Sequence, residues 1–382
     1  MNNLFVRKEE KKVEYLELIY DLIFVYVIGR NNSLLHQTAN GFVDGKIFLS
    51  YILCTLTIIQ IWNFSTYYIN MHGKNGIRDH ICLFINMFLL YFIGEGTRTH
   101  WDGFLLEYNI AWGLILVNIG IQYFLELPHL KEHPVVYDQT RRMGIVLIIE
   151  SVIVFISYPV YQVSGFTVAP FAILFGIVGT MIHGSKAKVI LVDFAHLTER
   201  AMFYVVFTFG EMIIALAVYF EGGFTGNSFY FSLMSFLIVV GLFLSYGTVY
   251  DHLIDREMKN SGLVYMLLHI FMIFALSIIT TSLEFMHDSE VALLPKILML
   301  ILSFIMYYLS LFFTLRYSKS KCRPTAKFII SMCLIAVGFV IFMLLFKDMM
   351  YVNIAITVVY VWGIFFLLHH FSKTTVSEHF KF

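Results

Sequence analysis

The sequence has few charged residues and few cysteines. Charged side chains make up 14% of the 382 residues, whereas a soluble chain has roughly 25%. The formal net charge is zero, so nothing indicates nucleic-acid binding and we expect no nucleic-acid partner. The four cysteines (Cys54, Cys82, Cys322 and Cys333) have no CxxC spacing, so neither a disulfide framework nor a zinc site is expected.

The sequence also lacks the common catalytic and nucleotide-binding motifs. It contains no GxSxG, HExxH, Walker A or GxGxxG pattern, so nucleotide-driven transport or hydrolysis of these types would need a partner subunit. The longest segment between apolar runs is about twenty residues, which leaves no room for a soluble domain. We expect no cofactor and no bound metal.

Long apolar runs are what the sequence has instead. Hydrophobic residues are 59% of the chain, the mean hydropathy is +0.77, and apolar stretches of membrane-spanning length recur from end to end. The sequence therefore predicts an all-α, polytopic integral membrane protein. Its predicted membrane-spanning helices lie at 15–34, 47–70, 81–97, 104–125, 143–163, 166–183, 200–220, 229–250, 262–281, 292–315, 327–346 and 350–370.

The distribution of Lys and Arg predicts the orientation of these twelve helices. With an inside N-terminus, only five of the 26 basic residues lie outside and the other 21 lie inside, as the positive-inside rule requires. The five outside residues are Arg30, Lys46, Arg98, Lys296 and Lys347. We therefore predict a multi-pass membrane protein with both termini in the cytoplasm.

The span pattern repeats along the chain. A shift of about 183 residues places the first six predicted helices on the second six and carries Tyr67 onto Tyr250. This spacing predicts two parallel six-helix halves, 1–183 and 184–382, related by a pseudo-twofold axis along the membrane normal. Because few residues are identical, chance regularity among evenly sized helices is the alternative.

Charged residues occur inside the first helix of each predicted half. In "VEYLELIYDLIFVYVIGR", Glu17 and Asp21 stand four residues apart on one helix face, and Arg30 follows. In "HLTERAMFYVVFTFGEMIIAL", the charged residues are Glu199, Arg200 and Glu211. The spacings predict that Arg30 and Glu211 lie at similar depths, where they could neutralise each other.

These two stretches resemble the signatures of the bacterial low temperature requirement A family. Weaker matches are "WNFSTYYIN" at 62–70 and "YMLLH" at 265–269. The sequence departs from the family pattern where Asp251 follows "GTVY", and Arg30 stands where a neutral polar residue is common. The resemblance places the family's polar signature on Glu17, Asp21, His196, Glu199, Arg200, Gly210, Glu211 and His269.

Each candidate residue also has a structural interpretation. Glu17 and Asp21 could be interfacial helix caps, favoured by the helix dipole by about 0.3–1 kcal/mol each. We instead favour a pairing of these acids with Arg200 or His196 at the cytoplasmic mouth. Glu150 and Glu211 lie near mid-membrane, where an acid is paired, protonated or functional. His269 fits a packing role as well as a functional one.

Two classes of function remain. The first is a secondary transporter or an ion or proton pathway with a midplane acidic site at Glu150, Glu211 and Arg30, linked by the family resemblance to growth at low temperature. The second is a non-transporting membrane protein: a stress-response scaffold or an intramembrane enzyme acting on a lipid or quinone. We favour transport and expect as partners membrane lipid and a small solute or ion. A homodimer is compatible with the sequence.

Overall fold

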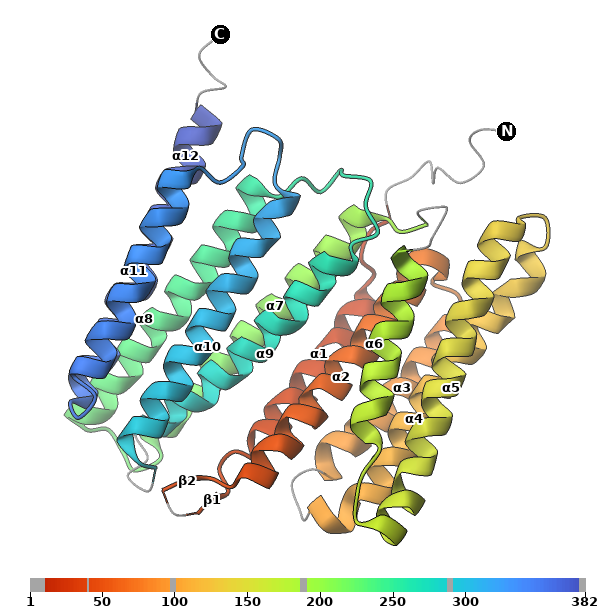
Figure 1. Cartoon of the computed structure of the whole chain (residues 1–382), viewed down its shortest axis with the longest axis horizontal. Helices are drawn as coiled ribbons and strands as arrows, with labels where there is room; N and C mark the ends of the chain where they lie inside the picture. Colours follow the sequence, from red (N-terminus) through yellow and green to blue (C-terminus); the bar gives the residue numbers. More distant parts are fainter. Residues whose placement is uncertain (1–10, 40, 97–100, 186–190, 287–290, 378–382) are drawn as a thin grey trace. The chain divides into compact units, whose positions relative to one another are not determined.

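The computed structural model describes residues 11–39, 41–96, 101–185, 191–286 and 291–377. These residues form twelve α-helices, four short 3₁₀ or π turns and one β-hairpin (Figure 1). The helices are α1 (Tyr15–Asn32), α2 (Gly45–His72), α3 (Ile77–Gly96), α4 (Trp101–Glu126), α5 (Pro134–Ser164), α6 (Ala169–Ser185), α7 (Phe194–Ala215), α8 (Gly226–Thr248), α9 (Leu263–Phe285), α10 (Leu293–Thr314), α11 (Ala326–Leu345) and α12 (Met350–Ser377). The predicted all-α class is confirmed.

Ten helical segments of the described chain are long and apolar enough to cross a membrane. The two helices outside this set are α1 and α6. Helix α1 carries Glu17, Asp21 and Arg30, and α6 has a short apolar stretch, Ala169–Ile182. The chain is therefore a multi-pass membrane protein, while the count of twelve spans stays a prediction.

Several helix ends follow from local sequence signals. Helix α8 begins after Thr225, whose hydroxyl accepts a hydrogen bond from Ser228 N at 3.1 Å, and Thr325 caps α11 in the same way. Helix α5 begins at Pro134, which needs no hydrogen-bond acceptor for its nitrogen. It ends at Ser164 and is followed by Gly165, whose φ of +72° favours glycine.

The chain divides into two compact units. The first contains the described residues up to Leu35, Gly45–Tyr204 and Glu257–Met266, and the second contains His36–Asp44, Val205–Arg256 and the residues from Leu267 onward. The predicted halves, 1–183 and 184–382, and their repeat relation stay predictions. The basic residues Arg7, Lys8, Arg98, Lys186, Lys188 and Lys381, which entered the charge count, lie outside the described residues.

The first unit is a bundle built around α1 to α6. Helix α1 packs against α2 and α3, α4 packs against α3 and α5, and α6 packs against α5 and α2. The close approach of α4 and α5 depends on Gly144, because a Cβ there would stand 3.0 Å from the ring of Phe124. Its core contains the buried aromatic side chains of Tyr20, Phe24 and Trp62.

The second unit contains α8, α10, α11 and α12 together with the hairpin of β1 (Thr38–Ala39) and β2 (Phe42–Val43). Helix α8 packs against α12, and α11 packs against α10 and α12. Thr38 pairs with Val43 in the antiparallel hairpin. Helix α8 continues into a short π-helical turn, Val249–Leu253.

Exposed apolar side chains support a lipid environment. Helix α11 exposes Ile330, Leu334, Val337, Ile341 and Leu345 at spacings of three and four residues, so they cover one helix face. Leu334 is 68% exposed and Leu345 is 69% exposed. Such a continuous apolar surface would be unfavourable in water and is stable against lipid tails.

Candidate functional site

A buried ion cluster joins α1 to α7 in the first unit. Arg200 donates from Nε to Asp21 Oδ2 at 2.9 Å and from Nη2 to Asp21 Oδ1 at 2.5 Å, which is the two-pronged geometry of a strong guanidinium–carboxylate pair. Its Nη1 donates to Glu17 Oε2 at 2.5 Å. Arg200 and Asp21 are fully buried, and Glu17 is 4% exposed.

The helical spacing of α1 explains why one arginine reaches both acids. Glu17 and Asp21 stand one turn apart and therefore point from the same helix face towards α7. The predicted pairing of these acids with Arg200 is present in the structure. Both carboxylates are buried and ion-paired, which favours this pairing over their interpretation as interfacial helix caps, although Glu17 does lie in the first turn of α1.

Helix α2 supplies two further side chains to the cluster. Trp62 Nε1 donates to Asp21 Oδ1 at 2.8 Å, so Asp21 accepts three hydrogen bonds in all. Asn70 Nδ2 lies 3.0 Å from His196 Nδ1. The other ring nitrogen of His196, Nε2, lies 3.3 Å from Glu17 Oε2, within ion-pair distance but outside good hydrogen-bonding geometry.

The N-terminus of α7 is fixed to α2 by a reciprocal pair of hydrogen bonds. Asn70 Nδ2 donates to the carbonyl oxygen of Asp193 at 2.8 Å, and Asp193 N donates to Asn70 Oδ1 at 2.9 Å. The Asp193 carboxylate in turn accepts from His196 N at 3.1 Å. These contacts hold the first turn of α7, and with it Arg200, in register with α1 and α2.

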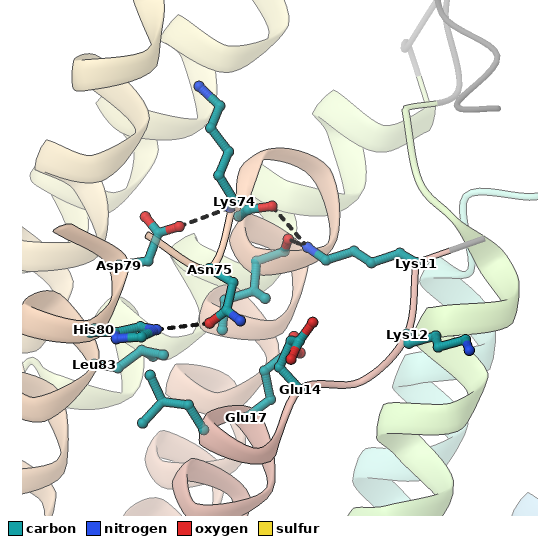
Figure 2. A pocket seen from close by; sticks show the side chains of 12 residues that line it. Lys11, Lys12, Glu14, Glu17, Lys74, Asn75, Asp79, His80 and Leu83 are labelled. Carbon is teal, nitrogen blue, oxygen red and sulfur yellow. Dashed lines mark hydrogen bonds between the residues drawn. The ribbon is translucent and has the colours of Figure 1, made fainter. Parts of the chain in front are cut away.

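A pocket of about 240 Å³ in the first unit borders this cluster (Figure 2). Glu17 belongs to its wall and also to the ion cluster. Lys11 Nζ donates to the carbonyl oxygens of Ile69 and Gly73, the second at 3.2 Å. The remaining lining residues are Lys12, Glu14, Leu16, Lys74, Asn75, Asp79, His80 and Leu83.

The charges of the cluster do not balance. Glu17 and Asp21 share a single guanidinium, that of Arg200, so within these three side chains one negative charge remains. Lys11 in the pocket wall also attracts Glu17 electrostatically. Asp21 has three donors, whereas Glu17 has one donor from Arg200 and faces the pocket. The excess charge is therefore best placed on Glu17, the acid that a solute in the pocket can approach.

A sequence profile of the bacterial low temperature requirement A protein, LtrA, matches residues 12–362. The chain belongs to the LtrA family. The ion cluster consists of residues from both family-like stretches, and Trp62 and Asn70 come from the weaker match at 62–70. No curated protein and no solved structure matches the chain.

Glu150 is a second buried acid of this LtrA-family protein. It lies on α5 and is fully buried. Both of its carboxylate oxygens lack a hydrogen-bond partner among the described residues. Of the three roles expected for a mid-membrane acid (paired, protonated or functional), pairing has no support for Glu150 among the described residues.

Arg30 and Glu211, two further predicted site residues, belong to different units. Arg30 Nε is 3.1 Å from the Tyr26 hydroxyl and 3.5 Å from Glu95 Oε1, both in the first unit. Glu211 is partly exposed and belongs to the second unit, so the predicted Arg30–Glu211 pair would join residues of different units and stays a prediction.

Two further predicted residues have clear places in the structure. His269 is buried in the second unit, where its Nε2 lies 3.2 Å from the Tyr246 hydroxyl, a contact that suits a packing role. Glu199, next to Arg200 in the chain, is partly exposed and has no ion pair with another described residue. Within the described ranges, no group of three His, Cys, Asp or Glu residues is arranged to hold a metal ion.

Proposed function

We propose that this LtrA-family protein is a secondary transporter or an ion or proton pathway of the bacterial cytoplasmic membrane. In this proposal, Glu17 takes up a proton or cation from the pocket. The observation that carries it is the surplus acid of a buried ion cluster standing in the wall of a pocket. A surplus carboxylate is costly in a buried site, so it favours uptake of a positive charge.

The direction of access follows from the charges around the pocket. Lys11, Lys12 and Lys74 line it, and basic residues gather on the cytoplasmic side of membrane proteins. We therefore propose that the pocket opens to the cytoplasm. Ion flux through this protein would also be the activity that supports growth at low temperature, the phenotype named in the family's description.

Flux through the purified protein tests the proposal. Protein in liposomes that contain a pH-sensitive dye should dissipate an imposed proton or cation gradient faster than empty liposomes. Glu17→Gln should reduce flux to the empty-liposome level, because the surplus charge is lost. Glu14→Gln is the matched control, since Glu14 lines the same pocket and has no ion pair among the described residues.

Two results would contradict the proposal. One is the absence of flux in the unmodified protein across a panel of ions and solutes, which would favour a scaffold or an intramembrane enzyme. The other is equal flux in Glu17→Gln and Glu14→Gln. Folding of each variant is checked by its elution as a single peak in detergent.

The proposed orientation has its own test in intact cells. A cysteine at Glu221 should react with a membrane-impermeant maleimide, and a cysteine at Arg323 should not, because these residues lie in loops expected outside and inside. The background protein should lack reactive native cysteines. Burial raises the pKa of the native Cys322 thiol and slows its reaction, so Cys322 adds little background in the same loop as Arg323. Labelling at Arg323 with none at Glu221 would reverse the orientation.

A further inference from the structure

Glu150 occupies the middle of α5, with sixteen residues before it and fourteen after it in the helix. Its side chain has no exposed surface, and neither carboxylate oxygen has a hydrogen-bond donor among the described residues. No charged side chain in the described ranges acts on it electrostatically. A negative charge in this position would have nothing in the described part of the chain to stabilise it.

Gln60 on α2 and Gly176 on α6 define the space around this carboxyl group. A Cβ atom at Gly176 would stand 2.2 Å from Glu150 Oε2 and 2.2 Å from Gln60 Nε2, so these two atoms are at most twice that distance apart. All three residues lie near the middle of their helices. Because position 176 is glycine, the space that a side chain would fill there is available to the Glu150 carboxyl group and the Gln60 amide.

Three buried acceptor oxygens at this point lack a hydrogen-bond donor among the described residues. Gln60 Nε2 donates to the Ile173 carbonyl oxygen at 3.1 Å, which fixes the orientation of the amide. Its Oε1 is buried without a partner, as are both oxygens of Glu150. One proton added to the carboxylate removes its charge and turns an unpartnered acceptor into a donor.

A metal cation suits this geometry less well than a proton. Hard cations need several oxygen ligands around them, and Gln60 places its NH₂ group, a donor, next to the Glu150 carboxylate. A proton needs only the carboxylate itself. We infer that Glu150, together with Gln60 and Gly176, forms a binding site for a single proton inside the first unit.

A polar stripe on α2 connects this site with the pocket. Gln60, Asn63, Tyr67 and Asn70 follow one another at spacings of three and four residues, so they lie on one helix face over about 15 Å. Asn63 Oδ1 is buried and has no partner among the described residues. The stripe ends at Asn70, which contacts His196 beside Glu17 in the ion cluster.

This arrangement gives the proposed pathway a defined ion. Protons taken up at Glu17 would pass along the polar face of α2 to Glu150, and from there towards the other side of the membrane. The role in transport rests on the proposed function. The proton site itself rests only on the surroundings of Glu150, so the two can fail separately.

An apolar carbodiimide tests the site without any transport assay, because it attaches covalently to buried carboxyl groups that carry a proton. The reagent should modify Glu150 in the full-length protein in membranes at neutral pH, as detected by mass spectrometry of the peptide. It should leave Asp21 unmodified, because that carboxylate is held by Arg200 and Trp62. Absence of modification at Glu150 in protein that does react at other carboxyl groups would overturn the inference.

Gly176→Ala tests whether the site depends on the shared space. The atoms nearest to the new methyl group are the ends of two flexible side chains, so the fold should survive while Glu150 and Gln60 are forced apart. Carbodiimide modification of Glu150 should change at least severalfold in rate. Gly338→Ala is the control, because a Cβ there meets nothing within 4 Å and the rate should not change. Equal rates in both variants would contradict the role of Gly176.

The two tests separate this inference from the proposed function. Modification of Glu150 in a protein that shows no flux would leave the proton site standing and remove the transport role. Flux that persists at the normal rate in Glu150→Gln, with Glu150 unmodified in the parent protein, would remove the proton site and leave transport through Glu17 standing.

Discussion

Asp21 and Glu150 are both fully buried acids of the first unit, yet their surroundings are opposite. Asp21 accepts three hydrogen bonds, two from Arg200 and one from Trp62. Glu150 accepts none among the described residues. Burial alone therefore does not define the role of an acid in this protein, because the donors around it decide whether it holds a charge or a proton.

Glu17 combines features of both acids. It shares Arg200 with Asp21, as a structural ion pair does, and it also lines a pocket. The comparison suggests a division of roles in which Asp21 anchors Arg200, Glu17 exchanges a charge with the pocket, and Glu150 holds a proton at mid-helix. Substitutions of these acids and of their hydrogen-bond donors test the three roles separately.

Removing the arginine should have the largest effect on stability. Arg200→Gln leaves Glu17 and Asp21 buried without their counter-charge, and breaking a buried pair in this way costs about 3–5 kcal/mol. We expect a large loss of folded protein, measured as the yield of the single elution peak in detergent and as the midpoint of thermal unfolding.

A surface ion pair provides the control for this loss. Arg142 pairs with Asp138, and the two side chains are 49% and 41% exposed, so Arg142→Gln should cost about 1 kcal/mol or less. Equal losses in Arg200→Gln and Arg142→Gln would show that burial of the Arg200 cluster does not matter.

Neutralising Asp21 should have a smaller effect. Asp21→Asn removes charge-assisted hydrogen bonds, but Arg200 keeps Glu17 and the pair is then balanced, so we expect a loss of about 2–3 kcal/mol. The double variant with Arg200→Gln should be more stable than the sum of the single losses predicts, because the charges are removed together. Strictly additive losses in thermal unfolding would argue against coupling of the two residues.

Trp62→Phe should cost less again. It keeps an aromatic ring beside Tyr204 and removes one hydrogen bond to a charged acceptor, for which we expect about 1.5 kcal/mol. The bond is measured by comparing the loss in unfolding midpoint that Trp62→Phe causes in the parent protein with the loss that it causes in Asp21→Asn. If the tryptophan change costs as much in the Asp21→Asn background, its effect comes from packing and not from the bond.

Glu150→Gln should have the smallest effect on stability. If Glu150 carries a proton, the change replaces one neutral group by another of similar shape, and unfolding should shift by less than about 1 kcal/mol. Proton flux should nevertheless be lost, because glutamine does not release a proton. Thermal unfolding and flux measured on the same preparation check both parts. A strongly destabilised Glu150→Gln would indicate that the native residue is charged and held by a partner.

The helices could be predicted from the sequence more completely than the site. Hydropathy placed a helix at 327–346, and α11 is Ala326–Leu345. It placed another at 143–163, whereas α5 begins at Pro134, because Arg141 and Arg142 lie in a helical extension beyond the apolar run. Hydropathy reports where a chain is apolar, and a helix can continue into polar surroundings.

The ion cluster was partly predictable and the Glu150 site was not. The four-residue spacing of Glu17 and Asp21 indicated a shared helix face, and the resemblance pointed to Arg200. Trp62 lies in a stretch that carried a weaker family match, so a signal for it existed. The contact of Glu150 with Gln60 and Gly176 involves three helices far apart in sequence, and it depends on how each helix is rotated in the bundle, which no local pattern encodes.

The infrared spectrum of the purified protein in lipid tests the central comparison most directly. A protonated carboxylic acid has a carbonyl band separate from that of a carboxylate. We predict that this band is present in the parent protein, remains in Asp21→Asn and is lost in Glu150→Gln at neutral pH. A band that is unchanged in Glu150→Gln, or one that disappears in Asp21→Asn, would contradict the assignment of the charge to Asp21 and the proton to Glu150.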